Sequence, residues 1–224
     1  VFSVADTVSK ADGGTFDGNV TMAGTLGVTG ATTLTGGVSG NTTFSGEIIT
    51  STSGTSNVRI GENAGDAIAS GGNYNVVIGD EAGTAITTGD NNVAVGYNAL
   101  ATNTTASTNT AVGYQAAYSN QTGVGLTAFG ANALYATTAS DNCGIGTDNP
   151  GNYKAALEDN TSGRFNTAVA TGALGSNTEG NYNTAVGHSA GASVTTGDNN
   201  VAVGFEALTT EDTGQNNVAI GYRA

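Results

Sequence analysis

The residues of this chain best suited to acid–base chemistry are its carboxylates. The 224-residue sequence holds 18 Asp and Glu against five Lys and Arg, a formal net charge of −13. Cleavage of a glycoside needs two carboxyl groups that face each other across a groove, about 5 to 10 Å apart. The acidic pairs here are sequence neighbours, as in Asp80 and Glu81, and neighbours on a strand point to opposite faces. The sequence therefore predicts no catalytic residues and no enzyme.

A metal or cofactor site is equally hard to assemble from this sequence. His188 is the only histidine and Cys143 the only cysteine, whereas a structural zinc site takes four such ligands. Asp90 and Asp198, in Gly-Asp-Asn turns, could in principle bind calcium. The Gly-Gly-x-Gly-x-Asp nonapeptide of calcium β-rolls, however, is absent. We predict no metal and no cofactor, and interpret Cys143 as a small core residue.

Exposed aromatic residues are the best candidates for contact with another molecule. They recur at one position of a repeat, where His188 also lies. In an exposed groove they could stack on the sugars of a cell-surface glycan, because aromatic rings offer large apolar faces. The alternative is that they cover the seam between coils or chains. The candidates are Tyr97, Tyr114, Phe205 and Tyr222.

These aromatic positions belong to a short repeat that fills the last three quarters of the chain. Most copies read Asn-Val/Thr-Ala-Val/Ile-Gly, and the final residue of each copy serves here as the anchor, from which positions are counted. A period of 17 is too short for helical-hairpin repeats and predicts about ten coils of a parallel β-solenoid, or β-roll. One longer step, from Gly146 to Ala170, predicts a loop inserted at 148–164. The anchors are Gly61, Gly79, Gly96, Gly113, Gly130, Gly146, Ala170, Gly187, Gly204 and Gly221.

The residues just before each anchor predict one short strand per coil. Position −1 is always apolar, and position −3 is Val or Thr in every copy but the one with Cys143. A period of two puts both rows on one side, and we expect that side to fill the core. A strand that is apolar on both faces is buried on both, so the small residue at position −2 is expected to contact sister chains in a homotrimer. This alanine row comprises Ala94, Ala111, Ala128, Ala168, Ala185, Ala202 and Ala219.

Two further patterns predict how the rest of each coil is built. Position +4 is Leu in four copies, and where it is Gly, as at Gly83, an apolar residue such as Ile86 follows three residues later. One large apolar side chain per coil is thus expected from the far wall. Asn occupies position −4 in nine copies, as at Asn92 and Asn109, and stacked amides can form a ladder.

A second, shorter repeat precedes the solenoid. Glycines six residues apart, such as Gly18, Gly24 and Gly30, alternate with sparse apolar residues over 16–49. Such hexads cannot bury a core within one chain, so we expect a β shaft in which three chains wind around one axis; a left-handed hexapeptide β-helix remains the alternative. Residues 1–15 form a lead segment, 50–56 a joint and 57–224 the solenoid. The fold class is therefore all-β, with an intertwined or side-by-side homotrimer.

Composition excludes several partners. Nucleic acids and anionic membranes attract basic surfaces, which a chain of charge −13 lacks. No apolar run approaches the roughly 20 residues of a membrane span, so we expect no membrane insertion. Bulky apolar residues are scarce beside 36 glycines, and chains with thin cores often gain stability by oligomerising.

The copies Asn92-Val-Ala-Val-Gly-Tyr and Asn217-Val-Ala-Ile-Gly-Tyr resemble the head repeat of trimeric autotransporter adhesins, a family of trimeric left-handed parallel β-rolls. They are also similar to repeats in tail-fibre proteins of marine and cyanobacterial phages. The hexads, as in Gly24-Thr-Leu-Gly-Val-Thr-Gly, are similar to slender trimeric shafts of phage fibres.

Together the resemblance implies a phage tail-fibre shaft that positions a host-recognition element, located in the virion or at a cell surface. Its implied partners are other copies of itself, other virion tail proteins and a host glycan or receptor. The alternatives are the head of a bacterial trimeric adhesin and a subunit of a self-polymerising extracellular filament.

Overall fold

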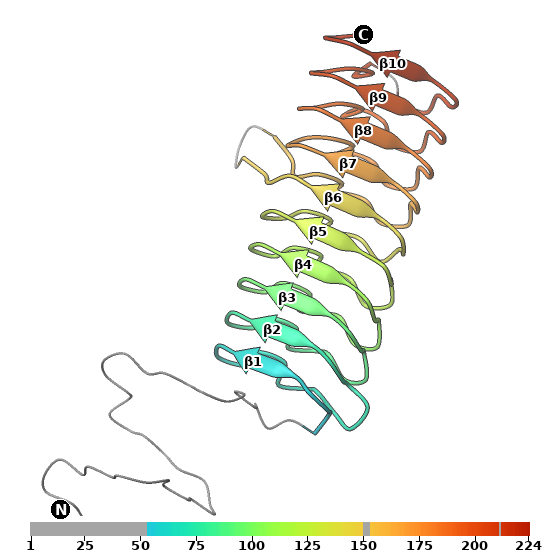
Figure 1. Cartoon of the computed structure of the whole chain (residues 1–224). Helices are drawn as coiled ribbons and strands as arrows, with labels where there is room; N and C mark the ends of the chain where they lie inside the picture. The colour runs from blue at the N-terminus through green and yellow to red at the C-terminus, as the bar shows by residue number, and fades with distance from the viewer. Residues whose placement is uncertain (1–52, 150–152, 211) are drawn as a thin grey trace, which may run out of the picture. The chain divides into compact units, whose positions relative to one another are not determined.

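A computed structural model describes residues 53–149, 153–210 and 212–224, and in them the chain is a parallel β-solenoid (Figure 1). A single ten-stranded sheet runs in the order β1 to β10, with about nine turns between its first and last strands. This part of the chain contains no α-helix, so no segment of it is a candidate for a membrane-spanning helix. The predictions for 1–15, for the hexads at 16–49 and for the start of the joint lie outside the described residues.

Each strand occupies positions −3 to −1 of one copy of the repeat, as the sequence predicts. Every neighbouring pair is parallel and in register, so that Ala94 lies opposite Ala111 and Ala111 opposite Ala128. Equivalent side chains therefore follow one another up the sheet. The strands are β1 (Val58–Ile60), β2 (Val76–Ile78), β3 (Val93–Val95), β4 (Thr110–Val112), β5 (Thr127–Phe129), β6 (Cys143–Ile145), β7 (Thr167–Val169), β8 (Thr184–Val186), β9 (Val201–Val203) and β10 (Val218–Ile220).

The anchor glycine ends each strand because the chain turns there with a backbone that L-residues rarely adopt. Gly113 has φ of 138°, and a Cβ built on it would lie 2.5 Å from the carbonyl oxygen of Gly130, one coil further on. Successive coils thus touch backbone to backbone at this corner. Ala170, the one anchor that is not glycine, has φ of 104°.

The side of the strand that faces the core is the reverse of the prediction. Ala94, Ala111 and Ala128 are fully buried within a single chain and belong to its hydrophobic core. The larger residues of positions −3 and −1 point outward, and Ile60 and Phe129 remain 58% and 56% exposed. The prediction that the outward rows fill the core is therefore wrong.

The same burial shows that the alanine row cannot be a contact face between chains. Its seven residues line the inside of one coil stack: Ala94, Ala111, Ala128, Ala168, Ala185 and Ala202 are buried, and Ala219 packs partly buried against them. The physical reason is the narrow interior. At Gly144, which takes the alanine position in β6, even a Cβ would come within 3.1 Å of Leu134 Cγ, so a valine or isoleucine has no room beside a far-wall leucine. The exception is Val77 in β2, which is buried at this position against Gly65 and Gly83.

The far wall supplies the large core side chains, as predicted. Leu100, Leu134 and Leu174 are buried at position +4. Where that position is glycine, the space is already occupied: a Cβ on Gly83 would lie 2.7 Å from both Ile86 Cδ1 and Val77 Cγ1. Core volume is thus kept nearly constant from coil to coil by exchanging leucine for glycine plus isoleucine.

The predicted asparagine ladder is also present. The Asn92 N–H donates to Asn75 Oδ1 at 2.9 Å, and the Asn92 side-chain amide donates to the Ala106 carbonyl at 2.9 Å. The pattern continues through the buried amides of the other coils. It is interrupted at Leu126, which takes the asparagine position and donates its own N–H to Asn109 Oδ1.

A second row of buried amides was not predicted. Asn103, Asn120, Asn160 and Asn177 lie at the equivalent of position +7 and are buried beside the first ladder. Asn109 and Asn120, one from each row, both donate to the Gly123 carbonyl. Asn120 both accepts from the Gly123 N–H and donates to the Gly123 carbonyl, which closes the turn. These amides satisfy backbone groups that would otherwise be buried without partners.

The inserted loop is shorter than the predicted span of 148–164. The coil resumes by Ala156: Leu157 is buried and its N–H donates to the Ala173 carbonyl at 3.1 Å. The departure from the coil is marked by an antiparallel bridge between Asn149 and Tyr153. It leaves strands β6 and β7 in normal register.

Candidate assembly surface

The outward side of the ten-stranded sheet is a continuous surface of β-branched and apolar residues. We call it the outer face and define it by positions −3 and −1 of every strand. Because the strands are in register, each row repeats at the interstrand spacing of about 4.8 Å, over a length of about 43 Å. The −3 row is Val58, Val76, Val93, Thr110, Thr127, Cys143, Thr167, Thr184, Val201 and Val218. The −1 row is Ile60, Ile78, Val95, Val112, Phe129, Ile145, Val169, Val186, Val203 and Ile220.

Neither row of the outer face contains a charged residue. Large apolar side chains nevertheless meet solvent along its length, with exposures of 56% at Phe129, 38% at Ile145 and 39% at Val186. Scattered apolar residues are normal on a protein surface, but contiguous apolar patches mark sites of interaction. Depletion of charged residues at the centre of a surface patch is a further property of protein–protein interfaces.

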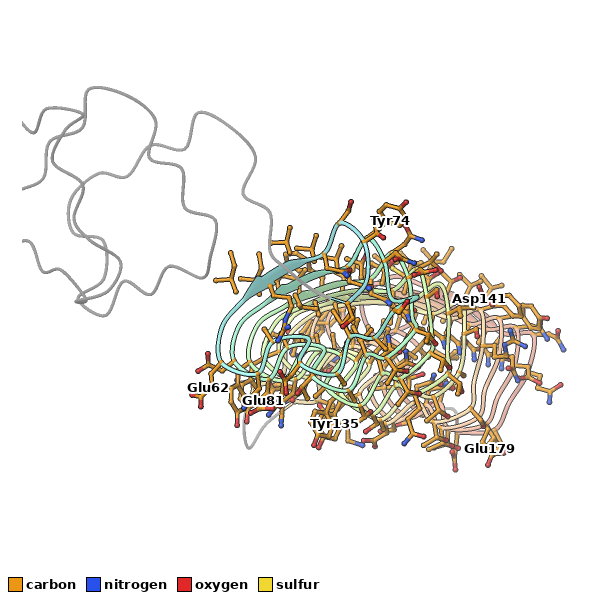
Figure 2. The ribbon with its side chains drawn as sticks, turned by 90° about the horizontal axis from the view of Figure 1, so that it is seen from below. Glu62, Tyr74, Glu81, Tyr135, Asp141 and Glu179 are labelled. Atoms are coloured by element: carbon orange, nitrogen blue, oxygen red, sulfur yellow. The ribbon has the colours of Figure 1, made fainter. Side chains whose placement is uncertain are left out.

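The charged side chains of the described residues lie on other walls of the coil. Figure 2 views the stack from below, with Glu62 and Glu81 at its rim and Tyr135 and Glu179 on the wall away from Tyr74. Ion pairs of the described residues lie on these exposed walls, among them Arg164 with Asp141 at 3.2 Å and Arg223 with Glu206 at 2.6 Å.

The four candidate aromatics form stacks along the solenoid at position +1, beside the outer face. The ring centroids are 5.7 Å apart for Tyr97 and Tyr114, and 5.4 Å apart for Phe205 and Tyr222. His188 joins the second stack, 5.3 Å from Phe205. Inside each stack, every ring face is covered by the next ring. This favours a role in covering the seam between coils over a role in stacking on sugars. Their exposure, 39% to 70%, leaves contact with another molecule as a prediction.

Further aromatic stacks were missed in the sequence. The ring centroid of Tyr118 lies 5.2 Å from that of Tyr135, and the centroid of Phe165 lies 5.1 Å from that of Tyr182. The Arg164 guanidinium lies over the Phe165 ring, 5.2 Å from its centroid. The signal was available, because the members of each pair lie one repeat apart. Each stack adds a coil-to-coil contact of about 0.5 to 1.5 kcal/mol.

Among the described residues, Glu158 and Cys143 have shifted pKa values, and neither belongs to a reactive cluster. Burial raises the pKa of Glu158 above its usual 4.5, although the Ala155 N–H, 2.6 Å from Glu158 Oε2, opposes the shift. Burial likewise raises the pKa of the Cys143 thiol. Cys143 lies on the outer face, half-buried, and not in the core as predicted. Across the described residues, no three His, Cys, Asp or Glu side chains converge as metal ligands.

Comparisons with known proteins add no identification to this geometry. The chain matches no protein family, no curated protein and no solved structure.

Proposed function

We propose that this chain is a structural fibre component that assembles as a homotrimer through its outer face. The observation that carries the proposal is the uncharged, apolar surface over all ten strands. An isolated soluble coil stack has no evident need for such a surface. Burying it between copies would remove its valine, isoleucine and phenylalanine side chains from water, at about 25 cal/mol per Å² of apolar area.

A second copy of the chain fits this surface better than an unrelated partner. The outer face repeats at every coil, and only a partner with the same spacing can offer a matching side chain at each level. Copies with a net charge of −13 repel one another over most of their surface, so a stable contact is confined to the one wall without charge. Three copies around an axis along the solenoid form a closed assembly in which each outer face is covered.

Such an assembly is a stiff rod, and we assign it the role of a shaft in a phage tail fibre that holds a host-recognition element away from the virion. Backbone hydrogen bonds link its successive coils, and the buried asparagine ladder adds to them on both sides of the interruption at Leu126. The second candidate is the head of a bacterial trimeric adhesin, which the Asn-Val-Ala-Val-Gly-Tyr repeats favour. In that case the exposed aromatic stacks are the surface offered to a host glycan or receptor.

The test is the solution mass of the purified chain by light scattering, with and without a charge on the outer face. We expect three times the 21.8 kDa mass of the single chain, and a reduced mass for Val112→Lys. Thr105→Lys is the matched control, because Thr105 is exposed and lies outside the outer face; it should keep the wild-type mass. A wild-type monomer would overturn the proposal.

A further inference from the structure

We infer that Phe129 sets the axial register in which copies of this chain pack, so that the assembly closes as a ring and does not grow as a staggered filament. The inference depends on the proposed homotrimer and adds to it a residue that determines specificity. It assigns to one side chain of the outer face a task that the other members of the face cannot perform.

A strictly periodic face specifies only weakly the axial register in which two copies pack. If one copy slides along another by one coil, about 4.8 Å, valine and isoleucine again meet valine and isoleucine. All levels except the last remain paired. The same difficulty arises in flat, repetitive strands, where register is weakly specified. A contact that is slipped by one coil is heterologous, and such contacts produce open helical assemblies when they do not close.

Phe129 breaks this periodicity. It is the only aromatic residue of the outer face, and its strand neighbours in the −1 row are Val112 and Ile145. Its ring is 56% exposed, against 38% for Ile145. Residues of the −3 row at this level are small, with Thr127 in its own strand and Cys143 in the next, so the ring stands above its surroundings.

The other exposed phenylalanines of the described residues are held within their own chain. Phe165 stacks on Tyr182, and Phe205 on His188 and Tyr222. Phe129 takes part in no ring stack among the described residues, so its ring is free to contact another copy. In register, the Phe129 rings of all copies lie at one level and can pack on one another. Slipped by one coil, each ring meets an aliphatic level of its neighbour and holds the two faces apart.

The experiment measures the size distribution of the full chain by sedimentation velocity and native mass spectrometry. For the wild type we expect a single species of three chains. Phe129→Val gives this position the residue type of its own row, so the fold is kept; we expect additional species larger and smaller than the trimer. The matched control is Phe205→Val, a phenylalanine that is 39% exposed and lies outside the outer face, and it should give only trimer.

A second variant separates register from local packing. Moving the ring by two coils, in the double variant Val95→Phe with Phe129→Val, restores one aromatic level and should restore the single trimer. The inference is overturned if Phe129→Val alone remains a homogeneous trimer, a result that leaves the proposed function intact. A monomeric wild type would instead contradict the proposed function itself, and this inference with it.

Discussion

The two sides of the same three-residue strands differ in a way that simple burial rules do not anticipate. On the inner side Ala111 is fully buried, whereas on the outer side Thr110 is exposed and Val112 is half-buried. The smaller residue faces the core because the leucines of the far wall fill the interior; a valine, Val77, takes the inward position in β2, where the far wall has glycines instead. Side-chain size therefore depends on the room available on each side, and the larger apolar residues lie on the exposed outer face, which we propose that a second copy covers.

The largest effect is expected when the same charge is placed on the two sides in turn. Ala111→Lys forces a long cation into an interior that has no space and no counter-charge, and we expect a loss of at least about 4 kcal/mol in the free energy of unfolding. Denaturant unfolding followed by circular dichroism measures it.

Val112→Lys, one residue further on, is the matched variant for this comparison. Measured on the monomeric chain, its unfolding free energy should change by no more than about 0.5 kcal/mol, because a side chain at this position reaches solvent. If both lysine variants cost the same, the assignment of inner and outer sides would be wrong.

A smaller effect is expected from the amides of the inner side. In Asn109→Ala, the Leu126 N–H loses its hydrogen bond of 2.9 Å to Asn109 Oδ1, whereas the Gly123 carbonyl keeps the one from the Asn120 side-chain amide. Leaving this buried backbone N–H unsatisfied costs about 2 kcal/mol, measured again by denaturant unfolding. Asn109→Leu fills the volume, as Leu126 does in the next coil, without restoring the bonds. A Leu variant as stable as the wild type would show that volume, and not the amide, stabilises this position.

The smallest change in stability is expected from Glu158, which lies outside the uncharged outer face. Burial raises its pKa above 4.5 in the folded chain, so the folded state favours the protonated form. The stabilisation from this group is complete below the unfolded value, near pH 4.5, and is lost as pH rises through the higher folded pKa.

Glu158→Gln should therefore match the wild type at pH 4 and exceed it at pH 7, by at most about 0.5 kcal/mol because the group is partly solvated. Thermal unfolding at the two pH values measures the difference. A variant less stable than the wild type at pH 7 would contradict the sign of the shift.

Most of the architecture could be predicted from the sequence because each structural position recurs in the copies of the repeat with a similar residue type. The strand position, the in-register parallel sheet, the leucine–isoleucine exchange and the first asparagine ladder all follow from residues one repeat apart. The orientation of the strand could not be read from alternation alone, since a period of two defines two sides without saying which is inside. The signal was the contrast in size between Ala111 and Val112, which was interpreted as close packing between chains.

The predicted loop was too long for a similar reason. Ala156, Leu157 and Asn160 repeat the spacing of Ala133, Leu134 and Thr137 in the preceding coil, and the structure shows that they continue its wall. The anchor positions alone do not reveal this match, because the next anchor after Gly146 is Ala170. Residues 16–49, the homotrimer and the aromatic contacts remain predictions.

The extra residues between Gly146 and Ala170 show what the stack tolerates. Strands β6 and β7 pair in normal register on either side of them, so chain length added at a corner is not passed on to the neighbouring levels. Each coil can in this way diverge in sequence and length without disturbing the others. Because the coils lie about 4.8 Å apart, an insertion at the corner of a given coil places a new segment at a defined distance along the solenoid axis.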